Sequence, residues 1–244
     1  PEGQADSDGD GIGDACETSF AESGIAESDL CDTAEESVET VPPNIYFVLD
    51  TSGSMGSADG LTGAIADAKD ALDQMADQLY NQVNVGLLEY SGSSCGDNSE
   101  LLDLASYSDP QDIKDSYRNP ELGTGGRTPT AGALQTVRTN QLYELPSDPY
   151  PSLRNKAVIV ITDGNPNECG GQSNAESEAS ALNSAGVPVY VVGFQSGASP
   201  ANLTALAQAG GTQDYYNAQT TSALVTVLQN ISKIGRASCR ERVY

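Results

Sequence analysis

Histidine is absent from the 244 residues, and lysine and arginine together number only 11. The first absence excludes Ser-His-Asp and Cys-His catalysis, and with them zinc sites built on paired histidines. No apolar run approaches the roughly 18 residues that a transmembrane helix needs. The sequence therefore predicts neither a histidine-dependent enzyme nor a membrane-spanning helix.

Basic residues are so few that 35 acidic side chains leave a formal net charge of −24. A surface of this sign repels nucleic acid and anionic membranes, so neither is an expected partner. Composition alone leaves two interpretations of the acidity open. One is solubility or adaptation to a salty medium, and the other is divalent-cation binding by clustered oxygen ligands.

Cysteine is also scarce, and its five copies cannot all pair with one another. Cys239 lies in a tail, 234–244, that carries three arginines in an otherwise acidic chain. This tail resembles the in-frame translation of a sequencing adapter, so we exclude it from the fold. Even pairing then becomes possible among the four others, Cys16, Cys31, Cys95 and Cys169.

Residues 1–41 contain few large apolar side chains and read as a calcium-binding segment followed by an acidic linker. Oxygen ligands recur there at alternate positions, as a loop around a hard cation requires; the set is Asp6, Asp8, Asp10, the backbone carbonyl of Ile12, and Asp14. The string fits an EF-hand loop through Glu17, but no helix precedes it and Cys16 interrupts it. It resembles the thrombospondin type 3 repeat, which implies Ca²⁺, and the alternative is a merely acidic linker.

Two features of this segment stay open. Cys16 pairs either with Cys31 or with a cysteine in an upstream repeat. The chain begins with Pro1 and shows no signal peptide, so we expect a fragment whose targeting segment lies upstream.

From Pro42-Pro43 onward, short apolar strands alternate with amphipathic helices, which predicts one domain over 42–233. This alternation is typical of an α/β fold with a mostly parallel sheet covered by helices on both faces. The expected strands are 45–49, 83–90, 101–105, 156–163, 187–194 and 213–216, and the expected helices are 58–80, 109–117, 131–142, 174–185, 200–209 and 222–231.

Oxygen-bearing side chains follow two of these strands and one glycine-rich turn. Asp50, Ser52 and Ser54 follow the first strand, Asp163 follows the fourth, and the turn adds the hydroxyl of either Thr128 or Thr130. Ligands of parallel sheets bind beyond the carboxyl ends of the strands, where these residues gather. A ligand set without nitrogen or sulfur predicts Mg²⁺, Mn²⁺ or Ca²⁺ rather than zinc or copper. If the aspartates act through water, the charge of the ion is not fully neutralised by its direct ligands, and an incoming carboxylate would be attracted as the missing ligand.

These residues resemble the metal-ion-dependent adhesion site of von Willebrand factor A domains. The family's Asp-x-Ser-x-Ser element matches residues 50–54, its threonine matches Thr128 in Gly-Arg-Thr-Pro-Thr, and its Thr-Asp-Gly matches residues 162–164. The resemblance covers about residues 41–233. It implies a doubly wound, Rossmann-like sheet of six strands with a short antiparallel third strand. It also implies that the serines and Thr128 contact the ion, while Asp50 and Asp163 act through water.

Cys95 and Cys169 fall in loops beyond strand ends, on the same edge as the predicted metal site. Because an extracellular type of calcium repeat precedes them, we expect a disulfide rather than two free thiols. Such a bond would close a loop of about 75 residues, worth about 4 kcal/mol in the chain-entropy model.

Together these features predict a binding module of a larger secreted or cell-surface protein, and no enzyme. The module would capture an acidic side chain of a protein, matrix or cell-surface ligand at its metal ion. One alternative is an intracellular type of A domain that partners an ATPase. A metal-dependent hydrolase is the other, but the chain has no histidine, no base beside Ser52 or Ser54, and no phosphate loop.

Overall fold

The apolar run after Pro43 forms the centre of the molecule. The computed structural model describes residues 41–56, 63–118, 126–152, 154–195 and 197–234. Within them, β1 (Asn44–Asp50) is buried along its whole length between β2 (Asn84–Tyr90) and β4 (Lys156–Thr162). A strand that is covered on both faces has no exposed side to make polar, which explains the continuous apolar run.

The described strands form one six-stranded sheet in the order β3-β2-β1-β4-β5-β6. β5 (Val189–Phe194) and β6 (Tyr216–Ala218) continue it on one side, and β3 (Asn98–Ala105) forms the other edge. β3 pairs antiparallel with β2, and every other pair is parallel. The predicted α/β fold and the antiparallel third strand are confirmed.

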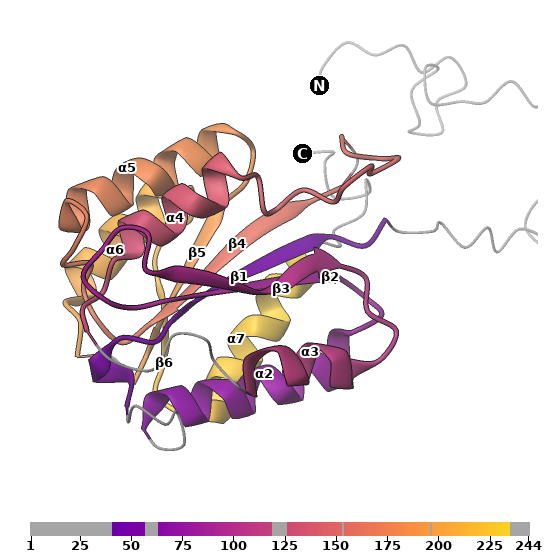
Figure 1. The fold of residues 1–244 in the computed structure, drawn as a ribbon, viewed down its shortest axis with the longest axis horizontal. Helices are drawn as coiled ribbons and strands as arrows, with labels where there is room; N and C mark the ends of the chain where they lie inside the picture. Colours follow the sequence, from indigo (N-terminus) through magenta and orange to yellow (C-terminus); the bar gives the residue numbers. More distant parts are fainter. Residues whose placement is uncertain (1–40, 57–62, 119–125, 153, 196, 235–244) are drawn as a thin grey trace, which may run out of the picture. The chain divides into compact units, whose positions relative to one another are not determined.

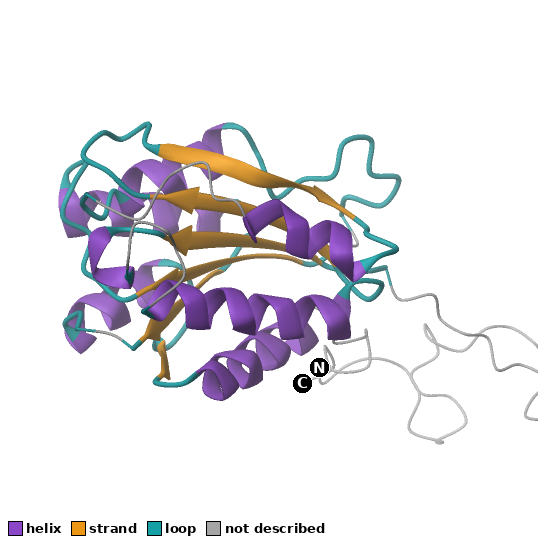
Figure 2. Ribbon diagram, turned by 60° about the horizontal axis from the view of Figure 1, so that its bottom comes forward, coloured by secondary structure: helices purple, strands orange, loops and turns teal. Residues whose placement is uncertain are grey.

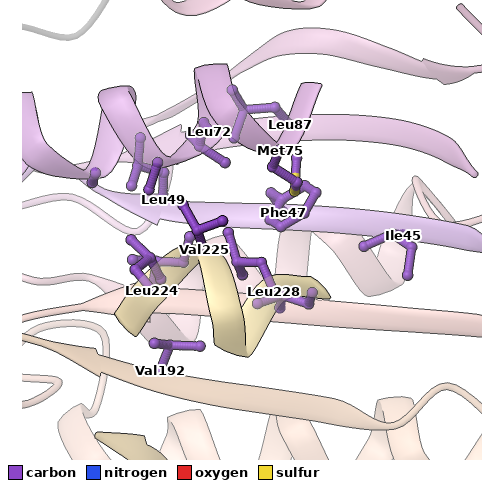
Figure 3. Close-up of a cluster of buried hydrophobic side chains, with 14 of the residues drawn as sticks. Ile45, Phe47, Leu49, Leu72, Met75, Leu87, Val192, Leu224, Val225 and Leu228 are labelled. Atoms are coloured by element: carbon purple, nitrogen blue, oxygen red, sulfur yellow. The ribbon is translucent and has the colours of Figure 1, made fainter. Parts of the chain in front are cut away.

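Helices cover both faces of the sheet (Figures 1 and 2). On one face lie α2 (Ala64–Leu79), α3 (Pro110–Arg118) and α7 (Thr221–Ile234), and on the other α4 (Thr130–Thr139), α5 (Gly171–Ser184) and α6 (Pro200–Ala209). Successive side chains of β1 point to opposite faces of the sheet. Phe47 packs with Met75 and Leu228 on the face that α2, α3 and α7 cover (Figure 3), while Val48 belongs to the cluster on the face that α4, α5 and α6 cover.

Several predicted elements differ from the structure at their ends, and three of them show a physical reason. β3 begins at Asn98 rather than 101, because Asn98 already pairs with Tyr90 of β2. β6 covers 216–218 rather than 213–216, because the small Ala218 is the residue that becomes buried opposite Phe194. α2 begins at Ala64 rather than 58. Gly63, directly before it, has a φ of 86°, which glycine adopts easily but which an α-helix does not contain.

Several sequence predictions lie outside the described residues. They are the calcium loop of Asp6, Asp8, Asp10, Ile12 and Asp14, the cysteines Cys16, Cys31 and Cys239, and the tail beyond Ile234. Within the described ranges, no helix combines the length and apolar character that crossing a membrane requires.

Candidate metal centre

The carboxyl ends of β1 and β4 lie side by side at one edge of the sheet, since the two strands are parallel neighbours. β1 ends at Asp50, and a 3₁₀ turn, Gly53–Met55, follows it. Asp163 comes directly after β4. Thr128 precedes α4, which packs against β1 and β2. The predicted residues thus arrive at one place from three separate segments.

Three hydroxyl groups face one another at this edge. The oxygens Ser52 Oγ and Ser54 Oγ are 3.3 Å apart, and Thr128 Oγ1 lies 3.3 Å from Ser52 Oγ. Ser54 also donates a hydrogen bond to Asp163 Oδ1 at 2.6 Å. Ser52 and Thr128 are buried, whereas Ser54 is exposed, so the cluster opens to solvent on the Ser54 side.

Asp50 is completely buried behind the hydroxyls. Its Oδ1 accepts the backbone N–H of Ser52 at 2.8 Å, and its Oδ2 accepts the hydroxyl of Thr162 at 2.5 Å. Burial raises the pKa of Asp50 to about 6, although these hydrogen bonds oppose the rise, and nearby Asp163 adds to it. The pKa of Asp163 is also raised, mainly by burial. A cation bound beside these two carboxyl groups would favour their ionised forms, which burial alone disfavours.

The geometry fits a hard divalent ion. Every side-chain group of the cluster is an oxygen donor, as Mg²⁺, Mn²⁺ and Ca²⁺ prefer. Gly164 borders the space: a Cβ added there would lie 3.3 Å from Thr128 Oγ1 and 3.7 Å from Ser54 Oγ. Nowhere in the described part of the chain do three or more Cys, Asp or Glu side chains form a metal-binding group. The cluster itself offers three hydroxyls and two carboxylates.

The structure distinguishes the two candidate threonines. Thr128 belongs to the hydroxyl cluster, whereas Thr130 donates to the hydroxyl of Tyr90 at 3.2 Å within the buried interior. Thr162 has a role that the sequence reasoning missed, because its hydroxyl fixes the second oxygen of Asp50. Its position directly before Asp163 was the available signal.

The loop that carries Thr128 contacts two other loops. Arg127 donates its backbone N–H to Gly92 O at 3.0 Å, in the loop after β2. Thr128 exchanges hydrogen bonds with Asn167, in the loop after β4. Cys95 and Cys169, one from each of these two flanking loops, are joined in a disulfide with Cα atoms 5.4 Å apart. The rim of the site is thus cross-linked covalently.

An exposed positive charge lies beside this cluster. The Arg127 side chain is 64% exposed, and its Nε lies 3.1 Å from Glu168 Oε1. Arg127 directly precedes Thr128 in the chain, and its partner Glu168 directly follows Asn167, which bonds Thr128.

Known proteins share this fold and sequence pattern. The human collagen alpha-6(VI) chain is 28% identical over 207 residues, which is 83% of this chain and 8% of that protein. The mouse collagen alpha-5(VI) chain is 32% identical over 150 residues, which is 62% of this chain and 5% of that protein. The chain therefore spans less than a tenth of the length of these curated relatives.

Solved structures agree on the fold. Proximal thread matrix protein 1 from the mussel byssus matches with a TM-score of 0.61 at 22% identity, over 79% of this chain and 47% of that one. The pilus adhesin SpaC from Lactobacillus rhamnosus GG matches with a TM-score of 0.58 at 16% identity, over 80% of this chain and 31% of that one. The family model described as the von Willebrand factor type A domain matches residues 44–232. Because this match covers most of the chain, the protein belongs to the von Willebrand factor type A domain family.

Proposed function

We propose that residues 42–233 form a divalent-metal-dependent adhesion module that captures an acidic side chain of a protein partner. The observation that carries this proposal is the meeting of three hydroxyls and two buried carboxylates at an edge that opens to solvent through Ser54. A site of this kind holds an ion on its buried side and leaves its open side to a partner.

The residues divide the work between holding the ion and balancing its charge. Ser52, Ser54 and Thr128 would contact the ion, and Asp50 and Asp163 would act through water. The bound ion would act as a Lewis acid that attracts a carboxylate oxygen. We propose Mg²⁺, Mn²⁺ or Ca²⁺, since all donors are hard oxygens. One structure of the mussel byssus protein is described with zinc in the corresponding motif.

The module would belong to a larger secreted or cell-surface protein. Its relatives are named as collagen chains, a byssus matrix protein and a pilus adhesin, which supports a matrix or cell-surface partner and a non-enzymatic role. The proposal includes Ca²⁺ at the N-terminal loop of Asp6, Asp8, Asp10, Ile12 and Asp14. The disulfide at the rim suits an oxidising compartment.

The proposal is tested by metal-dependent capture of carboxylate-bearing peptides. The full chain would be screened against paired peptides in which one glutamate is replaced by glutamine, with Mg²⁺ present or removed by EDTA. We expect binding that needs both the glutamate and the metal and that disappears in Asp50→Ala. A variant with Asp8 and Asp10 changed to asparagine should bind like the parent, since it alters only the N-terminal loop. Equal binding with and without EDTA would refute the proposal.

A further inference from the structure

Thr128 is fixed in place by contacts from outside its own segment. Pro129 follows it and has no backbone N–H, so the turn before α4 lacks one of the usual donors. On the preceding side, Arg127 is held to Gly92 by its backbone N–H. The backbone groups of Thr128 itself both pair with a single residue, Asn167.

Asn167 bonds both backbone groups of Thr128, one through its side chain and one through its own backbone. Its side-chain Oδ1 accepts the Thr128 N–H at 2.8 Å, and its own N–H donates to Thr128 O at 3.2 Å. Thr128 is 3% exposed, so a lost partner would leave a buried N–H unsatisfied. Asn167 itself is exposed. Its side chain therefore contributes this hydrogen bond rather than packing in the core.

The loop that carries Asn167 is itself restrained at the next two positions. Glu168 lies 3.1 Å from Arg127 Nε, and Cys169 is bonded to Cys95. A hydrogen bond from a restrained loop fixes its partner more narrowly than one from a mobile loop. The position of the Thr128 hydroxyl in the cluster thus depends on a group one loop away.

We propose that Asn167 is a positioning residue for the metal site: by bonding the Thr128 backbone, it sets the Thr128 hydroxyl at the distance from Ser52 that an ion requires. This inference rests on the metal site proposed above. Groups that orient metal ligands typically change metal affinity about tenfold to a hundredfold when they are removed. Asn167→Ala removes the side-chain acceptor alone and keeps the backbone N–H donor.

The same loop offers a matched control. Asn165 Oδ1 accepts hydrogen bonds from Ser199 N at 3.1 Å and from Asn202 Nδ2 at 3.2 Å, so it holds the start of α6 rather than Thr128. Asn165→Ala therefore removes a comparable asparagine, two positions away, without touching the site. Any general loosening of this loop would affect both variants.

The test combines a metal-free and a metal-bound measurement on the full chain. In the metal-free protein, amide hydrogen exchange at Thr128 should accelerate in Asn167→Ala and stay near the parent rate in Asn165→Ala. In calorimetric titrations with Mn²⁺, the binding that Asp50→Ala abolishes defines the site. Its Kd should rise about tenfold or more in Asn167→Ala and remain within about twofold in Asn165→Ala.

The outcomes separate the two proposals. If the parent binds Mn²⁺ at this site and Asn167→Ala binds equally well, the positioning role is wrong and the metal site stands. Equal weakening by both asparagine variants would also overturn it, because the effect would then be general. If Asp50→Ala and the parent titrate alike, the metal site itself is wrong, and the positioning role falls with it.

Discussion

The buried charge of Asp50 makes a prediction whose size follows from the structure. Its pKa rises from an ordinary 3.8 to about 6, mainly because the carboxyl is completely buried. The difference of about 2.2 corresponds to about 3 kcal/mol. The folded state therefore holds this proton more tightly than the unfolded state. Its stabilising contribution is complete below about pH 4 and is lost as the pH rises through about 6.

Asp50→Asn isolates this effect. The amide keeps an oxygen for the Ser52 N–H, and the Thr162 hydroxyl can turn to Gly164 O, which lies 3.2 Å away. We expect the metal-free variant to gain stability over the parent as the pH rises from about 4 to about 7, by about 3 kcal/mol in total. Carboxylates that do not interact with Asp50 titrate alike in both proteins and cancel in the difference, and Asp163, the smallest of the causes that act on Asp50, adds only a minor part.

The assay is urea unfolding in EDTA, followed by circular dichroism because the chain has no tryptophan. Mg²⁺ added at neutral pH should stabilise the parent strongly and Asp50→Asn little. A difference in unfolding free energy between the two proteins that stays constant from pH 4 to pH 7 would refute the reasoning about Asp50.

Three further predictions concern residues around the metal site. Gly164→Ala should weaken Mg²⁺ binding, because its Cβ would lie only 3.3 Å from Thr128 Oγ1 and press on that ligand. Gly197→Ala, whose Cβ would meet nothing within 4 Å, should leave binding unchanged, as paired calorimetric titrations would show. Changing Cys95 and Cys169 to serine should cost about 4 kcal/mol in urea unfolding, since the bond spans 74 residues; an unchanged midpoint would contradict this. Arg127→Ala should weaken capture of glutamate peptides while leaving the Kd for Mg²⁺ unchanged, and Lys114→Ala, paired with Asp77 on another face, serves as its control.

The strands of the sheet were predictable because burial leaves a local signature. The runs that became β1 and β4 are continuous apolar segments, since both faces of these strands are covered. β6 was placed wrongly because three residues with one buried alanine give no such signature. The antiparallel direction of β3 came only from the family resemblance, because strand direction depends on pairing with β2 rather than on the residues of β3.

The site could be predicted as far as the types of its side chains determine which metal they bind. Aspartates and serines at strand ends identify themselves as oxygen donors, and the predicted five gather at one edge. The contacts that hold them there show only in part: the position of Thr162 before Asp163 was a signal, but nothing local marks Asn167 as a partner of Thr128. Asn167 acts through the backbone of a residue 39 positions away, and Thr162 through an oxygen of Asp50 112 positions away. Such pairs become visible only when the fold brings the loops together.

The charge of the whole chain leads to an uncommon salt dependence for the proposed capture. A formal charge of −24 repels an acidic partner at long range, while the attraction of the bound ion acts only at contact. Salt shortens the range of the repulsion to about 10 Å at 0.1 M and leaves a direct metal–carboxylate contact much less affected. In the presence of saturating Mg²⁺, stopped-flow association with a glutamate peptide of net negative charge should therefore become faster as NaCl is raised from low to physiological levels. An association rate that falls over this range would show that local charges such as Arg127 and the ion, rather than the net charge of the chain, govern the approach of the partner.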